Sequence, residues 1–237
     1  MKLVSLNIER SKHLDRVIPF LQSVRPDAVC LQELKEDDIE QFKQALVMNC
    51  EFAPFGLHPK ETGHTDDISI VGVGIFSRTI SATSKNYYLG NETDARTTRA
   101  LRLQHLALLS CDVEHDGITF RVITTHFTWA PNGGTNAEQQ RDLPAMLDVL
   151  SAAGEFVLCG DFNAPRGGDV FSRIAARYTD NIPVEYTTTI DPLLHRAGPL
   201  PYVVDGLFST RGYEVTAVRL QDGVSDHQAI IAHIEKR

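Results

Sequence analysis

The sequence is poor in positive charge and in cysteine. Its 237 residues carry 23 Lys and Arg against 31 Asp and Glu, giving a net charge of −8. This balance excludes an overall basic field that would hold a polyanion, although a local basic groove remains compatible with it. The four cysteines have no close spacing, which argues against a disulfide framework or a thiolate metal site. We expect small buried side chains in a reducing compartment at Cys30, Cys50, Cys111 and Cys159.

The sequence also lacks long hydrophobic runs, low-complexity segments, linkers and internal repeats. It opens on a predicted strand rather than on a charged leader followed by an apolar segment, and nothing in it approaches a membrane span. We therefore expect a monomeric cytoplasmic protein that does not bind membranes. Its length is at the upper end for one domain, and no linker divides it, so we predict a single domain over residues 1–237.

The spacing of hydrophobic residues predicts a mixture of strands and helices. Two long polar segments, 56–67 and 84–98, are predicted as loops. The order of elements contains two β-α-β units, one from each half of the chain. Strands are predicted at 2–8, 27–32, 68–77, 100–113, 118–125, 156–159, 203–208, 213–220 and 228–234, and helices at 11–24, 37–48, 136–150 and 168–177.

Polar side chains follow the strands of both β-α-β units. Asn7 and Glu33 stand at strand ends in the first unit, and His126, Asp161 and Asn163 stand at strand ends in the second. Ligands of α/β proteins bind beyond the carboxyl ends of the strands, so we expect these groups to line one cleft between the units.

Each of these groups also has a purely structural interpretation. Asp161 and Asn163 are common turn residues, Asn7 is compatible with a core amide, and His126 with a buried donor to a carbonyl. Glu33 is compatible with the start of a loop, and the pair Asp226-His227 with a turn. Chance would scatter such groups along the chain, whereas here they gather at strand ends. We therefore favour a functional interpretation of the whole set.

Asp205 is harder to explain structurally, because it interrupts the apolar run Tyr202–Phe208. An unpaired carboxylate is costly to bury. His227 is its most sensible partner, since an Asp behind a His fixes the tautomer of the ring and raises its pKa. Asp161 with Asn163 is suited to orienting a water molecule. Hard oxygen donors with few His and no Cys select Mg²⁺ or Mn²⁺ over Zn²⁺, which indicates metal-assisted phosphoester hydrolysis.

The motifs SLNIE, LQE, TTHF, GDFNAP, the Asp of VVDGLF, and SDH occur in a characteristic order between Asn7 and His227. In this order they resemble the endonuclease/exonuclease/phosphatase superfamily of deoxyribonuclease-like, exonuclease-III-like and sphingomyelinase-like phosphoesterases. The resemblance covers almost the whole chain. It implies a four-layered α/β sandwich, in which two mixed sheets pack face to face with helices outside, and Mg²⁺-dependent cleavage of a P–O bond.

The resemblance also implies roles for individual residues. Glu33 matches the principal metal ligand, Asn7 its neighbour, and Asp226 a second carboxylate near the metal. Asp161 matches the residue that activates water, with Asn163 holding it. His227 matches the His that contacts the phosphate, oriented by Asp205. How the family divides base and metal-ligand roles between its Asp residues stays open.

Two further positions are informative by comparison with branches of the superfamily. His126 is similar to the His of the deoxyribonuclease and sphingomyelinase branches, where abasic-site endonucleases have a Tyr. Glu9 stands where abasic-site endonucleases carry an Asp, which gives it a minor metal role.

Candidates for binding the substrate are few. Arg96, Arg99 and Arg166 are the basic residues expected near the cleft, and Arg166 follows GDFNAP directly. A loop Arg in solvent is an equally good interpretation. Tyr202 stands where abasic-site endonucleases place a pocket aromatic, although it also fits a packing role. The sequence shows no exposed aromatic hairpin of the kind that would indicate a membrane lipid as the substrate.

These observations favour a Mg²⁺- or Mn²⁺-dependent phosphodiesterase or phosphatase. A nuclease acting on DNA or RNA is the alternative within enzymes. A catalytically inactive binding module on the same fold is an alternative from another class, and the full set of polar residues argues against it. A zinc hydrolase using His58, His64 or His126 lacks the expected ligand spacing.

Overall fold

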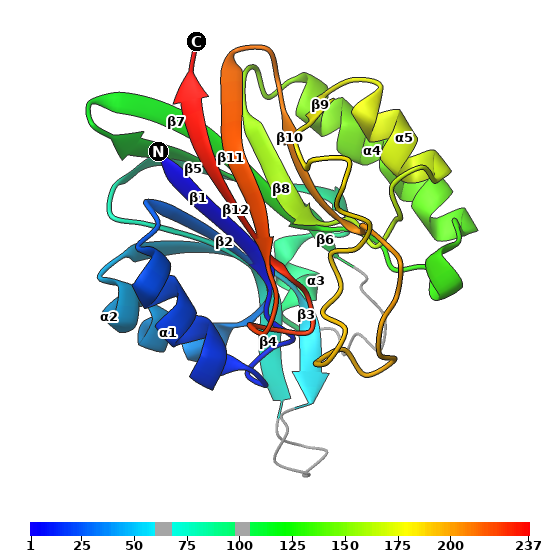
Figure 1. Ribbon diagram of the computed structural model, residues 1–237, viewed down its shortest axis with the longest axis horizontal. Helices are drawn as coiled ribbons and strands as arrows, with labels where there is room; N and C mark the ends of the chain where they lie inside the picture. Colours follow the sequence, from blue (N-terminus) through cyan, green and yellow to red (C-terminus); the bar gives the residue numbers. More distant parts are fainter. Residues whose placement is uncertain (60–67, 98–104) are drawn as a thin grey trace.

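In the computed structural model, which describes residues 1–59, 68–97 and 105–237, two six-stranded sheets stack face to face with helices on both outer sides (Figure 1). The first sheet has the strand order β11-β12-β1-β2-β4-β3 and the second β5-β6-β7-β8-β10-β9. Both sheets are mixed, because β1 pairs with β2 and β7 with β8 in parallel while the other pairs are antiparallel. The predicted four-layered sandwich is confirmed.

The first sheet joins the beginning and the end of the chain. Helix α1 (Leu14–Val24) connects its two parallel strands, and α2 (Ile39–Leu46) follows a short 3-10 turn at Glu36–Asp38. Both helices bury an apolar face on the outer side of this sheet. The strands are β1 (Lys2–Asn7), β2 (Ala28–Lys35), β3 (Asn49–Pro59), β4 (Ile68–Ser77), β11 (Tyr213–Gln221) and β12 (Ala229–Lys236).

The second sheet is formed by the middle of the chain. Helix α4 (Ala137–Ser151) connects the parallel strands β7 and β8, and it packs with α5 (Asp169–Ala175) on the outer side of the sheet. A single helical turn, α3 (Glu92–Ala95), follows β5, the first strand of this sheet along the chain. The strands are β5 (Ile80–Leu89), β6 (Leu106–His115), β7 (Ile118–His126), β8 (Val157–Asp161), β9 (Thr179–Asp180) and β10 (Asp205–Ser209).

The central core lies between the sheets and is almost entirely apolar. Cys30, Cys111 and Cys159 are buried in it, and all four cysteines are free. Among the polar links that cross this layer, the Gln32 amide donates to Thr124 Oγ1 at 2.9 Å. A buried hydrogen bond between the sheets favours one relative position, because sliding one sheet over the other would break this bond.

The two predicted polar loops are wrong where the structure describes them. Residues 56–59 are the end of the edge strand β3, and 84–89 are the end of the edge strand β5, which is followed by α3. Edge strands tolerate proline, as β3 does at Pro54 and Pro59, and β5 exposes a polar face, so neither shows a clear strand pattern. Residues 60–67 lie outside the described part of the chain.

Element boundaries differ from the prediction at functionally relevant points. Strand β2 continues through Glu33 to Lys35, whereas Glu33 was expected just after the strand. Strand β10 begins at Asp205 rather than two residues earlier, and α1 begins at Leu14 rather than at residue 11. Of the predicted strand 100–113, residues 105–113 are described, and β6 begins at Leu106.

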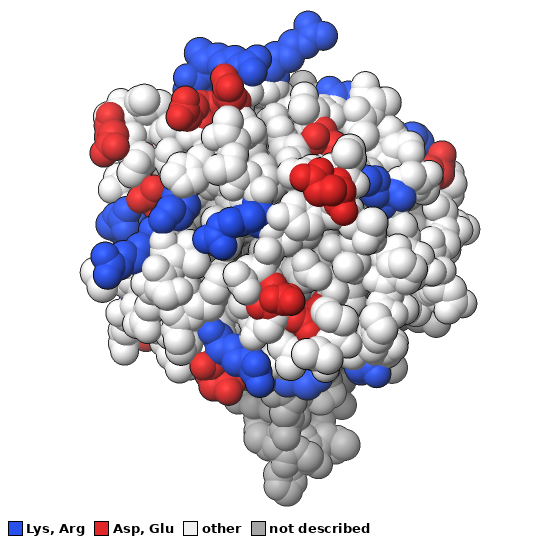
Figure 2. Space-filling model, in the orientation of Figure 1, with Lys and Arg blue, Asp and Glu red and all other residues white. Residues whose placement is uncertain are grey.

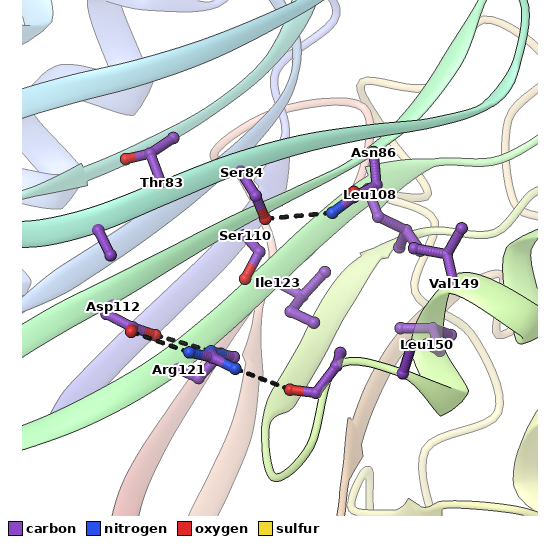
Figure 3. Close-up of a pocket in the computed structure, with 13 residues that line it drawn as sticks. Thr83, Ser84, Asn86, Leu108, Ser110, Asp112, Arg121, Ile123, Val149 and Leu150 are labelled. Atoms are coloured by element: carbon purple, nitrogen blue, oxygen red, sulfur yellow. Dashed lines mark hydrogen bonds and ion pairs between the residues drawn. The ribbon is translucent and has the colours of Figure 1, made fainter.

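A hollow of about 440 Å³ lies on the outer face of the second sheet, beside the end of α4 (Figure 3). Its floor carries an ion pair in which Arg121 donates to both carboxylate oxygens of Asp112, and Arg121 also donates to the Ala153 carbonyl. None of the strand-end polar residues singled out in the sequence lines it. In the described part of the chain, no helix is long and apolar enough to cross a membrane.

Candidate active site

Asp161 is the centre of a polar cluster formed by strands of both sheets. It is the last residue of β8 and is almost completely buried. Asn7, the last residue of β1, donates from Nδ2 to Asp161 Oδ2 at 3.0 Å across the interface between the sheets. The carboxyl ends of the parallel strands in the two β-α-β units therefore lie next to each other, as the polar residues at these strand ends predicted.

Glu33 approaches the same point from β2. The pairing of β2 with β4 shifts register between Leu31 and Leu34, and Glu33 lies in this bulge with φ +55°. A bulge re-aims a side chain, and here it turns Glu33 toward the site. Its Oε2 accepts from Arg10 at 3.0 Å, and its Oε1 lies 3.5 Å from Asn7 Nδ2.

The carboxyl of Glu33 is held in its ionised form. Burial by itself raises the pKa of this group, but the neighbouring His126 and the charge of Arg10 lower the pKa to about 2. The side chain is still 22% exposed. An ionised, accessible carboxylate beside an amide is the type of donor set that Mg²⁺ or Mn²⁺ binds, so Glu33 and Asn7 fit such an ion.

His126 ends β7 and lies between the two carboxylates. Its Nε2 is 3.6 Å from Glu33 Oε1 and 3.5 Å from Asp161 Oδ2, and its ring stacks on Phe55 with centroids 5.3 Å apart. Burial lowers the pKa of His126, but the nearby carboxylates of Glu33 and Asp161 outweigh it and raise the pKa. His126 therefore favours its cationic form beside two anions.

Asp205 and His227 form the expected pair. Asp205 begins β10, directly opposite Asp161 in the antiparallel register, and its Oδ2 is 2.8 Å from His227 Nδ1. The other ring nitrogen, Nε2, lies 3.9 Å from Asp161 Oδ2. Burial alone lowers the pKa of His227, but the charges of Asp205 and Asp161 raise this pKa well above its usual value. Thr189 adds a further link, because its hydroxyl oxygen accepts from the Asp205 backbone N–H.

Asn163 shapes the turn after β8. Its backbone N–H donates to Asp161 Oδ1 at 2.8 Å, and its side-chain amide donates to the Phe127 carbonyl at 2.9 Å. Asp161 thus has the turn role that its structural interpretation suggested, but through one oxygen only. The second oxygen, Oδ2, faces Asn7, His126 and His227.

Asp226 belongs to a neighbouring group. One ligand atom from each of Glu9, His13 and Asp226 lies within 4.8 Å of the others. His13 was not among the sequence candidates, because it stands inside the segment 11–24 that was predicted as helix. Its spacing of four residues from Glu9 is the signal that would have identified it.

The basic candidates are engaged elsewhere. Arg166 pairs with Asp180, with Nε 2.9 Å from Oδ2, and donates to the Ile182 carbonyl at 2.8 Å. Arg96 pairs with Glu36 and Glu92. Both Arg side chains therefore link segments of the protein.

The remaining candidates are not brought to the cluster by any contact among the described residues. Arg99 and His64 lie outside the described part of the chain. The ring of Tyr202 lies against Gly133, and His58 is 2.9 Å from the Pro59 carbonyl.

Comparisons with known proteins show the family and the fold. A family model described as "Endonuclease/Exonuclease/phosphatase family" matches residues 4–227. A comparison with curated proteins gives no match. Solved structures at 14–17% identity share the fold.

Three of these structures illustrate the variety of proteins that share this fold. An endonuclease/exonuclease/phosphatase from Bacteroides vulgatus has 16% identity and a TM-score of 0.73, covering 100% of this chain and 98% of that one. D. rerio TDP2 complexed with single-strand DNA product has 17% identity and a TM-score of 0.70, covering 100% and 99%. A mannosyl-6-phosphatase from Bacteroides thetaiotaomicron has 14% identity and a TM-score of 0.68, covering 99% of each chain.

Proposed function

Because the chain belongs to the endonuclease/exonuclease/phosphatase family, whose members act on phosphoesters, we propose that it is a Mg²⁺- or Mn²⁺-dependent phosphoester hydrolase. The observation that carries the proposal is the position of Asp161 Oδ2. It lies within 4 Å of donor groups on Asn7 at the end of β1, His126 at the end of β7, and His227 just before β12. A buried carboxylate that is surrounded by hydrogen-bond donors and lies near an ionised Glu33 is typical of an active site rather than of a purely structural position.

Each residue has a role in hydrolysis. Asp161 Oδ2 orients the attacking water and accepts its proton, while Asn163 holds Asp161 by capping Oδ1. The water oxygen forms a bond to phosphorus as the bond to the leaving oxygen breaks. His227, fixed through Nδ1 by Asp205, donates from Nε2 to a phosphoryl oxygen as negative charge develops there. His126 adds a second cationic donor on the side of Glu33.

A bound Mg²⁺ or Mn²⁺ would polarise a phosphoryl oxygen and offset its negative charge. Glu33 and Asn7 would hold the ion, with the negative charge of Asp226 nearby. The protein supplies the remaining elements itself, since the Asp205–His227 pair and the Asp161–Asn163 turn are complete in their own hydrogen bonds.

A small phosphodiester or phosphomonoester is favoured over nucleic acid as the substrate. The chain carries a net charge of −8, and Arg96 and Arg166 are paired with carboxylates. On the face shown in Figure 2, positive and negative side chains are interspersed. DNA or RNA remains the second candidate, since a structure with the same fold carries a single-strand DNA product. We further propose a cytoplasmic monomer, where the four free cysteines stay reduced.

The test is a panel of phosphoesters assayed with Mg²⁺, with Mn²⁺ and with chelator. The panel contains plasmid, abasic duplex, single-stranded RNA, a cyclic dinucleotide, an inositol phosphate and an aryl phosphodiester. We expect activity on a small substrate that chelation abolishes and either ion restores. Glu33→Gln should lower this activity by about 10²-fold or more, since it removes the charge that holds the ion.

The matched control is Asp148→Asn, which neutralises an exposed carboxylate on α4 and should leave activity unchanged. Full activity in chelator would contradict the metal requirement. Binding of one panel member without turnover under any condition would support the inactive binding module instead.

A further inference from the structure

One buried side chain of α4 contacts the chain after β7 and the chain after β8. Gln139, in the first turn of α4, is fully buried. Its Nε2 donates to the Thr128 carbonyl at 2.8 Å and to the Asn163 carbonyl at 2.9 Å. Thr128 lies two residues after His126, which ends β7. Asn163 lies two residues after Asp161, which ends β8. A single amide group therefore joins the two strand ends that present the imidazole and the carboxylate.

The amide of Gln139 acts only as a donor. Its nitrogen serves two carbonyl oxygens, whereas its own Oε1 is buried and has no hydrogen-bond partner among the described residues. Burying an unpaired amide oxygen costs free energy. An apolar side chain would avoid this cost but would leave the two carbonyls without this donor. The two carbonyls therefore explain the presence of Gln139 better than the packing of α4 does, since the helix already buries Leu143, Met146 and Leu147.

The Asn163 carbonyl belongs to the residue that orients Asp161. Asn163 has φ +49°, a left-handed conformation that non-glycine residues adopt infrequently. In this conformation its backbone N–H donates to Asp161 Oδ1 at 2.8 Å. A hydrogen bond to the Asn163 carbonyl holds the peptide plane that follows, and it opposes relaxation of the turn. Without it, we expect the carboxylate of Asp161 to lose its fixed orientation.

The chain after β7 is tied to the same turn. The Phe127 N–H donates to the Asp161 carbonyl at 2.8 Å, and Asn163 Nδ2 donates to the Phe127 carbonyl at 2.9 Å. Gln139 connects both segments to α4 through Thr128 and Asn163. A shift of either segment relative to the helix would therefore move the other as well.

We propose that Gln139 is a positioning residue for phosphoester hydrolysis, which holds His126 and Asp161 at their observed separation by donating to the chains after β7 and β8 at once. The atoms concerned, His126 Nε2 and Asp161 Oδ2, are 3.5 Å apart. A reacting group misplaced by about 1 Å can cost about 10²-fold in rate. The effect on rate rests on the proposed hydrolysis, whereas the effect on the geometry of the two strand ends does not.

The geometry is tested without a substrate by NMR-detected hydrogen exchange in Gln139→Met, which has a side chain of similar length but no donor. We expect the Asn163 N–H, which donates to Asp161, to exchange about tenfold faster or more. The amide of Cys159, in the middle of β8, is the internal reference for global unfolding. Its exchange should change by a clearly smaller factor.

The chemistry is tested by steady-state kinetics with the member of the phosphoester panel that is hydrolysed fastest. Gln139→Met should lower kcat by about tenfold or more with little change in KM, because the reacting groups are displaced while the surface that binds the substrate is kept. In the Asp161→Asn background the same substitution should lower kcat by about threefold or less, since no ionised carboxylate is left to position.

Gln140→Met is the matched control. Gln140 is the next residue of α4, but it is exposed and donates to Asp169 Oδ2 at 3.2 Å. This variant should leave both kcat and the exchange of Asn163 unchanged. Gln139→Asn is a milder second variant, because its shorter side chain keeps the amide but cannot reach both carbonyls. It should change kcat and exchange in the same direction as Gln139→Met, and it replaces that variant if Met at this position prevents folding.

Three results would overturn the proposal. The first is equal acceleration of exchange at Asn163 and Cys159, which would mean that Gln139 only stabilises the fold. The second is an unchanged kcat in the Gln139 variants of an active enzyme. The third is an equal loss of kcat with and without Asp161→Asn. If no panel member is hydrolysed, the proposed function is contradicted, and the exchange experiment still decides whether Gln139 holds the two strand ends.

Discussion

The two carboxylate oxygens of Asp161 have different partners, and this division explains how one residue serves both structure and chemistry. Oδ1 accepts from the Asn163 backbone and closes the turn, while Oδ2 faces Asn7 and two imidazoles. The sequence predicted Asp161 as a site residue because it ends an apolar run. It did not predict the division, which depends on the backbone conformation of Asn163 at φ +49°.

At Asp205, we expect the charge rather than the shape to matter. Asp205→Asn retains a hydrogen-bonding oxygen near His227 Nδ1 but loses the negative charge that raises the pKa of the ring. We predict a loss of about 10²-fold or more in kcat with little change in KM. His227→Ala should lose at least as much. Steady-state kinetics of the double variant decide the matter, because losses that multiply independently would show that the two residues do not act together.

Gly160 is required by the backbone immediately before Asp161. It has φ +151°, and a Cβ at this position would lie 2.1 Å from the Thr125 carbonyl oxygen on the neighbouring strand. Gly160→Ala should therefore destabilise the protein by about 3 kcal/mol or more, from strain together with the displacement of β7. Urea unfolding measures this loss.

Gly117→Ala is the control for the strain alone. Gly117 has φ +76°, with nothing within 4 Å of its Cβ position. It should cost about 1 kcal/mol. If Gly160→Ala and Gly117→Ala lower the free energy of unfolding equally, the close approach to Thr125 does not contribute to the cost.

At the scale of elements, the segment between β9 and β10 has little regular structure but is held by specific contacts. Thr189 accepts from the Val204 and Asp205 backbones, and Asp191 accepts from Leu193, Leu194 and Gly223. These bonds tie the segment to both Asp205 and the turn before His227. Such contacts follow no periodic pattern, so they could not be predicted from the sequence.

Asp191 should make stability depend on pH. Burial raises the pKa of this carboxyl, but hydrogen bonds from the Gly223, Leu194 and Leu193 backbones outweigh it and lower the pKa. A lowered pKa in the folded state means that this stabilisation is present at neutral pH and is lost as pH falls below the usual value of about 3.9. Asp191→Asn should therefore cost about 1–2 kcal/mol at pH 7 and progressively less in acid.

Urea unfolding at neutral and acidic pH measures this effect, with Asp148→Asn as the exposed control. An equal cost of Asp191→Asn at both pH values would contradict the assignment.

Two kinds of element were identified from the sequence. The helices of both β-α-β units have one apolar face on the helical period, and their central strands are short apolar runs that are buried on both faces. The edge strands β3 and β5 were missed because proline and exposed polar residues obscure the alternation. His13 was missed for a different reason: it stands in a segment that was predicted as helix, and its spacing of four residues from Glu9 was not interpreted as a contact.

At the scale of the whole molecule, net charge separates the two substrate classes. A protein with a charge of −8 gains little from long-range attraction to a polyanion. If the substrate is a small phosphoester, raising salt should weaken binding only modestly. A protein that neutralises several backbone phosphates would lose about 10³-fold in affinity between low and physiological salt. Affinity measured across a salt series distinguishes a small phosphoester from a nucleic acid as the substrate. A steep decline in affinity for DNA or RNA with rising salt would favour the nuclease.

The position of β12 has a consequence for the order in which the protein becomes competent during synthesis. Strand β12 lies between β11 and β1, so the first sheet joins a segment that leaves the ribosome early to one that leaves late. Asp226 and His227 immediately precede it. A growing chain therefore exposes Asn7, Glu33 and Asp161 while it still lacks the His227 imidazole and one neighbour of β1. We expect nascent chains to be inactive until β12 is inserted into the first sheet, so that the proposed hydrolysis begins only when folding is complete.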